Sequence, residues 1–501
     1  MTRLPMFIVG AVALLGVPAK PSGQSVELLD AWVSFTDKGP ITPERRRAAY
    51  LELEESYDPR ALDRRRRKRT LPGLFDDHDL PLYTPYVEGV GSTGAEVRVR
   101  SRWLNGVTVL ATRHQLDAVE ELPFVEAVSD LHPHVPKGAR RARIPRDPDL
   151  RRNPGPDADR VYGWAAPQIR QLNLHRLHDE GFRGSGIRIG VVDTGYLLSH
   201  HAFQNPGQTI RVVAQWDFMD NDSVVAPEPG DSPVQHQHGT LVLGTMAANQ
   251  PGELVGSAPE AEYLLLKAED DATEYFLEER WFAAALEFAE AHGADVVTSS
   301  VVLYQGYDPD DVDGRTSVMA RAWHLAVGNG IVGFQGAGNA GHDQDPATHH
   351  FLTPAAVAEV ITVGAVDSTG SVASFSSDGL RIEGSEKPEL LAWGAGTVSV
   401  SPYDFGAYTT SSGTSMATPL LAGAVACLLQ AHPDWSVRQV REALFRSGTY
   451  FLQKGGPDPL FIQGYGLPDI ARAAALFPSA PILPAGPVFD STPPRQGAGT
   501  P

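Results

Sequence analysis

The segment Gly413-Thr414-Ser415-Met416-Ala417-Thr418-Pro419 decides the fold of this chain. It places a serine between a glycine turn and an apolar run over residues 416–429, which predicts a helix that begins beside the serine hydroxyl. A serine at a helix amino terminus that faces a cleft is a candidate nucleophile. The same residues also fit an ordinary turn with a helix cap, so other segments must decide between these two interpretations.

Two segments further upstream favour the nucleophile. Residues 187–192 form an apolar run, broken only by Arg188, that stops at Asp193. This pattern predicts a buried parallel strand that ends in an acidic residue, where open α/β sheets place their sites. His238 opens a second helix-compatible run, where its ring can accept a proton from a hydroxyl and be held by a carboxylate. The candidate catalytic residues are therefore Asp193, His238 and Ser415.

Three motifs, Asp193-Thr194-Gly195, His238-Gly239-Thr240 and the segment around Ser415, resemble the catalytic blocks of the subtilisin-like serine proteases, the subtilases, in that family's order. A fourth block, Gly336-Ala337-Gly338-Asn339, is similar to the family segment whose asparagine helps to hold the oxyanion. The likeness covers about residues 162–475. It implies an α/β fold with a doubly wound, mostly parallel sheet, and it implies serine endopeptidase activity.

The chemistry explains why these residue types are needed. A serine hydroxyl is a poor nucleophile at neutral pH, so His238 would take its proton and later return it to the leaving amine. Asp193 would fix the tautomer of the imidazole, and Asn339 with the Ser415 backbone N–H would hold the oxyanion. Each residue also has a structural alternative: a helix cap for Asp193, a surface histidine for His238, and a turn residue for Asn339.

The substrate cleft is assigned from the same likeness. Ser300, Val301 and Val302 stand where many subtilases carry Ser-Leu-Gly along the strand that binds substrate, and Gly336, Ala337 and Gly338 complete the expected substrate-binding set. A branched valine in place of glycine predicts that Val302 restricts the pocket for the residue before the scissile bond. The alternative is a register shifted by one residue, with that side chain in the core.

The chain is expected to divide into a signal peptide, a small α+β propeptide domain, a linker, the catalytic domain and a proline-rich disordered tail. The first segment has Arg3, an apolar stretch and a small-residue end, which is typical of a signal peptide, with a membrane anchor as the alternative. The second has short strands and helices in an order that resembles the subtilase propeptide, which assists folding and inhibits until removed. The boundaries are 1–19, 20–136, 137–160, 161–477 and 478–501.

Charged residues give further expectations. The net charge is −19, and the acidic excess follows residue 160, which argues against a nucleic-acid partner. The basic run of residues 64–69 is interpreted as a solvated face of the propeptide. Two acidic clusters are interpreted as solvated loops, with structural calcium as the alternative. Their members are Asp217, Asp220 and Asp222, and Asp308, Asp310, Asp311 and Asp313.

Cys427 is the single cysteine, so no intramolecular disulfide can form, and its apolar surroundings predict a small buried side chain. Together these observations predict a secreted or extracytoplasmic monomer without a stable membrane span. It would be made as a zymogen, would act on protein or peptide substrates with its own propeptide as inhibitor, and would need no cofactor for the chemistry. Two alternatives stay open: a peptide ligase or macrocyclase, and a self-processing binding protein on the same fold.

Overall fold

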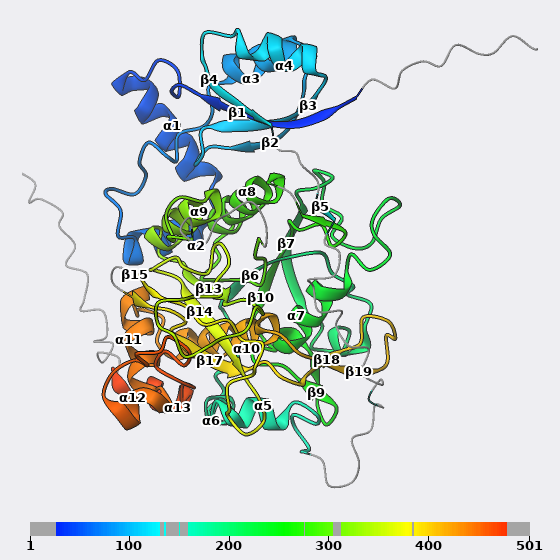
Figure 1. The fold of residues 1–501 in the computed structure, drawn as a ribbon, viewed down its shortest axis with the longest axis vertical. Helices are drawn as coiled ribbons and strands as arrows, with labels where there is room; N and C mark the ends of the chain where they lie inside the picture. Colours follow the sequence, from blue (N-terminus) through cyan, green and yellow to red (C-terminus); the bar gives the residue numbers. More distant parts are fainter. Residues whose placement is uncertain are drawn as a thin grey trace, which may run out of the picture.

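The computed structural model of this chain describes residues 27–130, 135–136, 150, 159–274, 276–303, 312–382 and 385–477 (Figure 1). The expected signal peptide and the proline-rich tail beyond residue 477 lie outside the described residues, as does most of the expected linker.

A parallel sheet forms the centre of the larger unit. Each pair of neighbouring strands in it runs parallel, and their residues are almost all buried because helices cover both faces. The doubly wound sheet expected from the sequence is confirmed. In spatial order, its seven strands are β17 (Leu390–Trp393), β14 (Ile361–Val366), β13 (Val332–Gly336), β12 (Val296–Ser299), β6 (Arg188–Asp193), β10 (Glu262–Lys267) and β7 (Arg211–Asp217).

The chain order reverses beside β6. From β6 the chain builds β7 and β10 on one side, and then crosses to β12 and continues through β13 and β14 on the other. The helices α8 (Leu277–Ala291) and α9 (Val318–Gly328) lie on one face, while α7 (Gln237–Ala247) and α10 (Thr414–Ala431) lie on the other (Figure 1). Sites in such sheets form at the carboxyl ends of the strands next to this reversal.

Short elements complete the larger unit. They are α5 (Ala166–Gln171), α6 (His175–Asp179), η1 (His201–Phe203), β8 (Asn249–Gln250), β9 (Leu254–Val255), β11 (Thr273–Glu274), β15 (Arg381–Ile382), β16 (Ser385–Glu386), β18 (Thr397–Val400), β19 (Tyr408–Ser411), α11 (Val437–Ser447), α12 (Thr449–Lys454) and α13 (Ile470–Leu476). Several of them, among them α5, α6, α12 and α13, lie at the end of the molecule opposite to the amino-terminal unit (Figure 1).

The amino-terminal unit is a small α+β domain, as expected. Its antiparallel sheet has the order β2-β3-β1-β4. Successive side chains of β1 point to opposite faces of this sheet, and both faces are buried there. Ala31 and Val33 belong to the core of this domain, whereas Trp32 belongs to the core of the larger unit. The elements are β1 (Leu29–Phe35), α1 (Pro43–Ser56), α2 (Pro59–Lys68), α3 (Thr84–Ser92), β2 (Glu96–Ser101), β3 (Gly106–Ala111), α4 (Arg113–Glu120) and β4 (Val125–Asp130).

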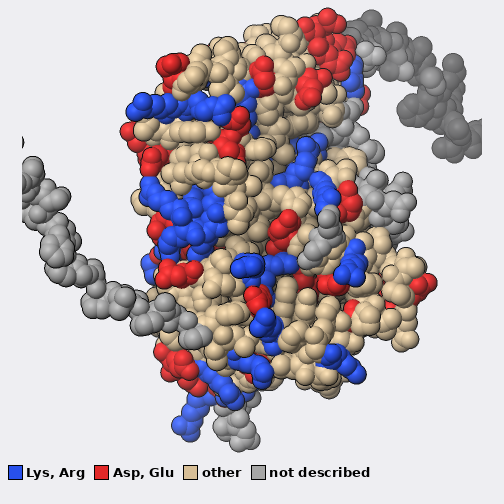
Figure 2. All heavy atoms as spheres, turned by 90° about the vertical axis from the view of Figure 1, so that its left-hand side faces the viewer, with Lys and Arg blue, Asp and Glu red and all other residues tan. Residues whose placement is uncertain are grey.

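The basic run of residues 64–69 is not the solvated face that the sequence suggested. Arg64 and Arg65 are 1% and 2% exposed, and Lys68 is buried as well. Of this run, only Arg66 and Arg67 are exposed. Figure 2 shows that basic and acidic side chains lie close to one another over one face of the molecule. The interpretation was wrong because sequence charge alone does not reveal the carboxylates that α2 meets in the folded protein.

Helix α2 packs against the ends at which the parallel strands begin. Arg60 donates to the Gly186 carbonyl over 2.6 Å, and Arg64 donates to the Asn329 carbonyl over 3.2 Å and to the Ala294 carbonyl. These three carbonyls lie just before β6, β13 and β12, respectively. Helix α2 of the amino-terminal domain therefore binds the parallel sheet at the end opposite to the carboxyl ends of its strands.

Glu290 on α8 is the centre of this contact. Its carboxylate is fully buried, binds Arg65 over 2.8 Å and also binds Arg64. Arg65 binds Asp79 over 2.7 Å as well. Burial alone would raise the pKa of Glu290, but the two guanidinium groups outweigh it and hold that pKa below its usual range. The two units are thus joined by buried ion pairs whose partners come from both sides.

Candidate active site

Asp193 is the last residue of β6 and is fully buried. Its Oδ1 atom accepts a hydrogen bond from the Thr194 backbone N–H over 2.7 Å. The strand forms because residues 187–192 are apolar apart from Arg188, and that side chain is bound by Asp58 and Glu262. The strand therefore ends with a carboxylate at the carboxyl end of the sheet, where sites form.

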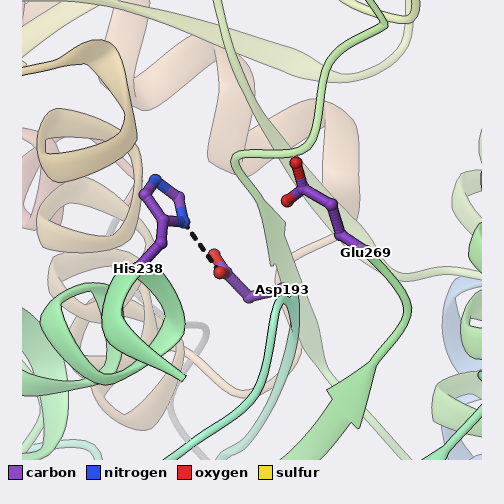
Figure 3. A group of neighbouring side chains, drawn as sticks. All are labelled: Asp193, His238 and Glu269. Atoms are coloured by element: carbon purple, nitrogen blue, oxygen red, sulfur yellow. Dashed lines mark hydrogen bonds and ion pairs between the residues drawn. The ribbon is translucent and has the colours of Figure 1, made fainter. Parts of the chain in front are cut away.

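His238 lies in the first turn of α7 and points toward Asp193 (Figure 3). Its Nδ1 atom is 2.7 Å from Asp193 Oδ1. The next residue must be glycine, because a Cβ atom on Gly239 would lie 2.2 Å from the Gly195 carbonyl oxygen. The close approach of these two glycines lets the carboxylate and the imidazole meet. A hydrogen bond at Nδ1 makes Nε2 the ring nitrogen that can accept a proton.

Ser415 lies in the first turn of α10 and is partly exposed, in contrast to most of that helix. Pro419 has no backbone N–H, so the helix cannot supply the usual donor for the Ser415 carbonyl. Ser300 Oγ donates to that carbonyl over 3.2 Å. The residue after β12 thereby helps to fix the backbone of the candidate nucleophile.

Asn339 is placed against the same helix terminus. Its Oδ1 atom accepts a hydrogen bond from the Thr414 backbone N–H over 2.9 Å, so Nδ2 is the donor end of the amide. The preceding Gly338 has φ +106°, a backbone conformation that favours glycine, and its N–H donates to Thr414 Oγ1 over 3.2 Å. The Gly-Asn motif thus positions an amide donor beside Ser415.

The candidate site residues gather in two groups. Asp193 and His238 contact each other directly, and Ser300 and Asn339 hold the first turn of α10. Helices α7 and α10, which carry His238 and Ser415, pack against each other.

The remaining substrate-binding candidates differ in what they expose. Val302 is partly exposed, whereas the Val301 side chain is fully buried and its carbonyl accepts a hydrogen bond from Gln335. Ala337 is also fully buried, in a small apolar cluster. Gly336 and Gly338 have no side chains, so a substrate could meet only their backbone. Val302 is therefore the apolar side chain of this set that reaches the surface.

Glu269 is a further residue near the site that the sequence interpretation missed. It follows β10, is 2% exposed, and offers a carboxylate oxygen within 4.8 Å of ligand atoms of both Asp193 and His238 (Figure 3). Part of the signal was present in the sequence, because the apolar run of residues 263–266 ends shortly before Glu269, as the run of residues 187–192 ends before Asp193. Only the strand order, which the sequence does not state, places the two carboxylates together.

Lys267, the last residue of β10, binds the first acidic cluster. Its ammonium lies 2.6 Å from Asp217 and 3.0 Å from Asp231, and Lys267 and Asp217 are nearly inaccessible to solvent. Burial would lower the pKa of Lys267, but these two carboxylates raise it above its usual range. The interpretation of this cluster as a solvated loop was therefore wrong for Asp217.

Cys427 and the rest of α10 belong to the core. The cysteine is fully buried, as predicted, and burial raises the pKa of its thiol. By length and composition, α10 is the helix among the described residues that could cross a membrane, but 83% of that stretch is buried inside the protein. This burial is expected for the core helix of a globular domain.

Comparison with known proteins decides the family. A model described as the subtilase family matches residues 184–466, which include Asp193, His238, Asn339 and Ser415. The chain belongs to the subtilase family. It is a subtilisin-like serine peptidase, and a model described as the peptidase S8 propeptide domain of Bacteroidota matches residues 30–144 ahead of the catalytic part.

Individual relatives agree with this assignment. The subtilase is 32% identical to subtilisin E of Bacillus subtilis over 317 residues, which cover 62% of this chain and 72% of the relative. It is 31% identical to subtilisin of Bacillus pumilus over 309 residues, 61% of this chain and 97% of the relative. The crystal structure of fervidolysin from Fervidobacterium pennivorans matches with a TM-score of 0.55 and 21% identity. That match covers 90% of this subtilase and 61% of the fervidolysin chain, which is less than two thirds of it.

Proposed function

We propose that this subtilase is an exported serine endopeptidase, made as a zymogen, that hydrolyses peptide bonds through an acyl-enzyme on Ser415. The observation that carries the proposal is the 2.7 Å contact between Asp193 and His238 at the carboxyl end of β6. A buried carboxylate that holds Nδ1 of an imidazole prepares Nε2 to act as a general base. The partly exposed serine on the helix packed against α7 is the hydroxyl that this base would serve.

The proposed cycle uses each residue in turn. His238 takes the proton of Ser415 as the oxygen attacks the scissile carbonyl, and then gives it to the leaving amine. Water repeats the sequence on the acyl-enzyme. Asp193 keeps the imidazole oriented and stabilises its charged form, while Asn339 Nδ2 and the Ser415 N–H donate to the developing oxyanion.

The zymogen part of the proposal is supported by a pairing between the two units. β5 (Val135–Pro136), at the end of the amino-terminal domain, pairs antiparallel with β11, a short strand of the catalytic part, and the two form a two-stranded sheet. Extended peptides bind proteases and other receptors by adding a strand in this way. The propeptide would therefore inhibit the peptidase by holding its own chain along β11, where a substrate would lie.

The proposed localisation is outside the cytoplasm, and the proposed assembly is a monomer. Both proposals rest on the sequence. Residues 1–19 resemble a signal peptide, and the large acidic catalytic part, with its single cysteine, can depend only on its core for stability.

The proposed chemistry needs no cofactor, and a structural calcium ion stays a prediction. Asp217, Asp222 and Glu228 offer carboxylate oxygens within 4.8 Å of one another, but the Lys267 ammonium already lies against Asp217. In the second acidic cluster, Asp313 accepts hydrogen bonds from its own turn, and the other members lie outside the described residues.

The experiment that tests the function combines two reagents. A fluorophosphonate probe labels a serine only where a base activates it, and a peptide library reports which bonds are cut. Labelling at Ser415 together with cleavage at internal bonds supports an endopeptidase. A ligated product, detected by mass when an amine acceptor is added, would instead show acyl transfer.

Asn339→Ala should lower kcat by about 10²- to 10³-fold with little change in KM, because the amide would act on the oxyanion and not on the bound substrate. This magnitude comes from measurements on a subtilisin. Steady-state kinetics on a small peptide check it. Asn329→Ala is a matched control far from the site, because this asparagine binds Arg69 next to α2. An unchanged kcat for Asn339→Ala would contradict the oxyanion role.

Val302→Gly should widen the pocket for the residue before the scissile bond. With Val302 present, large aromatic residues are expected to be disfavoured by about 1–3 kcal/mol relative to small or unbranched ones, since the branched side chain is stiff and partly exposed beside Ser300. Cleavage profiling of both proteins measures the selectivity. The same selectivity in both would show that Val302 does not shape the pocket.

A further inference from the structure

The segment that carries Glu269 is fixed against the Asp193–His238 pair by a buried glutamine. Gln235 Nε2 donates to the Thr194 carbonyl over 2.7 Å and to the Glu269 carbonyl over 2.5 Å. The Ala268 N–H also donates to the Asp193 carbonyl over 2.9 Å. These contacts fix the backbone of the segment that carries Glu269 beside the Asp193–His238 pair.

The strand that follows this segment leads an extended chain toward Glu269. In the antiparallel register, Pro136 pairs with Thr273, and Val135 pairs with Glu274. Because the pairing is antiparallel, a chain bound in this way runs from β11 toward Glu269 as it proceeds from its amino to its carboxyl end. Thr273, the first residue of β11, lies four positions after Glu269, which belongs to the segment that connects β10 to β11. A substrate that pairs in the same direction would pass Glu269 with residues on the amino-terminal side of its scissile bond.

We propose that Glu269 is a specificity-determining residue that selects an arginine or lysine side chain on the amino-terminal side of the scissile bond. The inference rests on the proposed peptidase function and names the substrate class of that same site. Its first substrate would be this chain itself, in the arginine-rich stretch after β5. The basic residues of that stretch, which lies outside the described residues, are Lys137, Arg140, Arg141, Arg143 and Arg146.

Electrostatics favour a cationic partner at this position. Glu269 is 2% exposed and lies near a second buried carboxylate, Asp193, so an added positive charge would be attracted by both in a region that excludes water. Asp270 and Asp271 follow on the same segment and add to the negative potential. The buried cation at the end of β10, Lys267, binds Asp217 and Asp231. A guanidinium group supplies charge and several donors in one side chain.

The test compares matched peptides on the autoprocessed enzyme made from the full-length chain. Each pair carries arginine or its neutral isostere citrulline at one position before the scissile bond. At the position that faces Glu269, the wild type should have a kcat/KM for arginine on the order of 10- to 100-fold above that for citrulline. Glu269→Gln, which keeps the shape and removes the charge, should bring this ratio close to one. Glu269→Lys should favour glutamate over arginine.

A charge-matched control separates this effect from net charge. Glu180→Gln removes an exposed carboxylate beyond α6 and should leave the wild-type ratio unchanged. Fluorophosphonate labelling gives the concentration of active sites, so a poorly folded variant does not distort kcat. If Glu269→Gln yields no folded enzyme, the arginine and citrulline peptides on the wild type still decide the preference.

Three results would overturn the inference. The first is a wild type with equal kcat/KM for the arginine and citrulline peptides at each position, and the second is a Glu269→Gln enzyme with the same ratio as the wild type. The third is a Glu269→Gln enzyme in which kcat/KM falls equally for both peptides. The last would mean that Glu269 acts through Asp193 and His238 and not on the substrate. Failure of the peptidase proposal itself looks different, since a wild type without it would neither take the probe at Ser415 nor cut any peptide.

Discussion

Ser415→Ala should abolish peptide hydrolysis and leave the precursor as one uncleaved chain. The expected loss in kcat is about 10⁶-fold, a magnitude measured on the triad of a subtilisin, because no other group in the proposed mechanism attacks the carbonyl. Self-cleavage between about residues 140 and 162 should stop as well, in the expected linker after β5. Gel mobility and the mass of the amino terminus of protein purified without other proteases measure this directly.

His238→Ala should give the same result as Ser415→Ala, and the double variant should be no worse, since the members of a triad act as a unit. Thr418→Ser, in the same helix, keeps the hydroxyl that bonds the Thr414 carbonyl and serves as the control that still matures. Peptide turnover that survives Ser415→Ala would refute the nucleophile. An alanine variant that still matures alone would refute self-processing.

Arg65→Ala should strongly destabilise the precursor. The substitution removes a guanidinium group that binds Glu290 and Asp79, all at most 2% exposed, and leaves both carboxylates with fewer partners in a buried place. Breaking a buried ion pair in this way costs about 3–5 kcal/mol. Urea unfolding of the uncleaved Ser415→Ala protein, with and without Arg65→Ala, measures the difference in the free energy of unfolding.

Arg67→Ala provides the matched control, because this neighbour on α2 forms its ion pairs with exposed Asp63 and Asp434. Exposed pairs contribute about 0–1 kcal/mol, so Arg67→Ala should barely shift the urea midpoint. Equal effects of the two substitutions would show that the buried pairs do not hold the two units together. In addition, the separate propeptide carrying Arg65→Ala should inhibit the mature enzyme more weakly than the unchanged propeptide.

Much of the catalytic unit could be predicted from the sequence, for identifiable reasons. An apolar run that ends in Asp193 indicates a buried strand, and a glycine turn before Ser415 and a long apolar run indicates a core helix. These are local patterns, and the strand and the helix formed where they indicated. The order of short strands and helices also indicated the propeptide, which the family model at residues 30–144 confirms.

The rest depends on contacts between distant segments, which a single sequence does not show. In the sequence, Arg65 resembles other basic surface residues, because its partner Glu290 on α8 lies 225 positions away. Asp217 resembles a loop residue until strand order sets Lys267 beside it. Glu269 was missed for the same reason, since only the neighbouring places of β6 and β10 in the sheet bring it to Asp193.

The position of α2 has a consequence for how the protein is made. Parallel sheets join segments that are distant in the chain, so they assemble slowly and expose unpaired edges meanwhile. Helix α2 precedes every strand of this sheet, and its side chains bond the backbone just ahead of β6, β12 and β13. A ribosome therefore delivers the helix first, and the residues just ahead of β6, β12 and β13, which emerge later, meet donors already in place. Translation order itself thus supplies a template on which the catalytic sheet can be built.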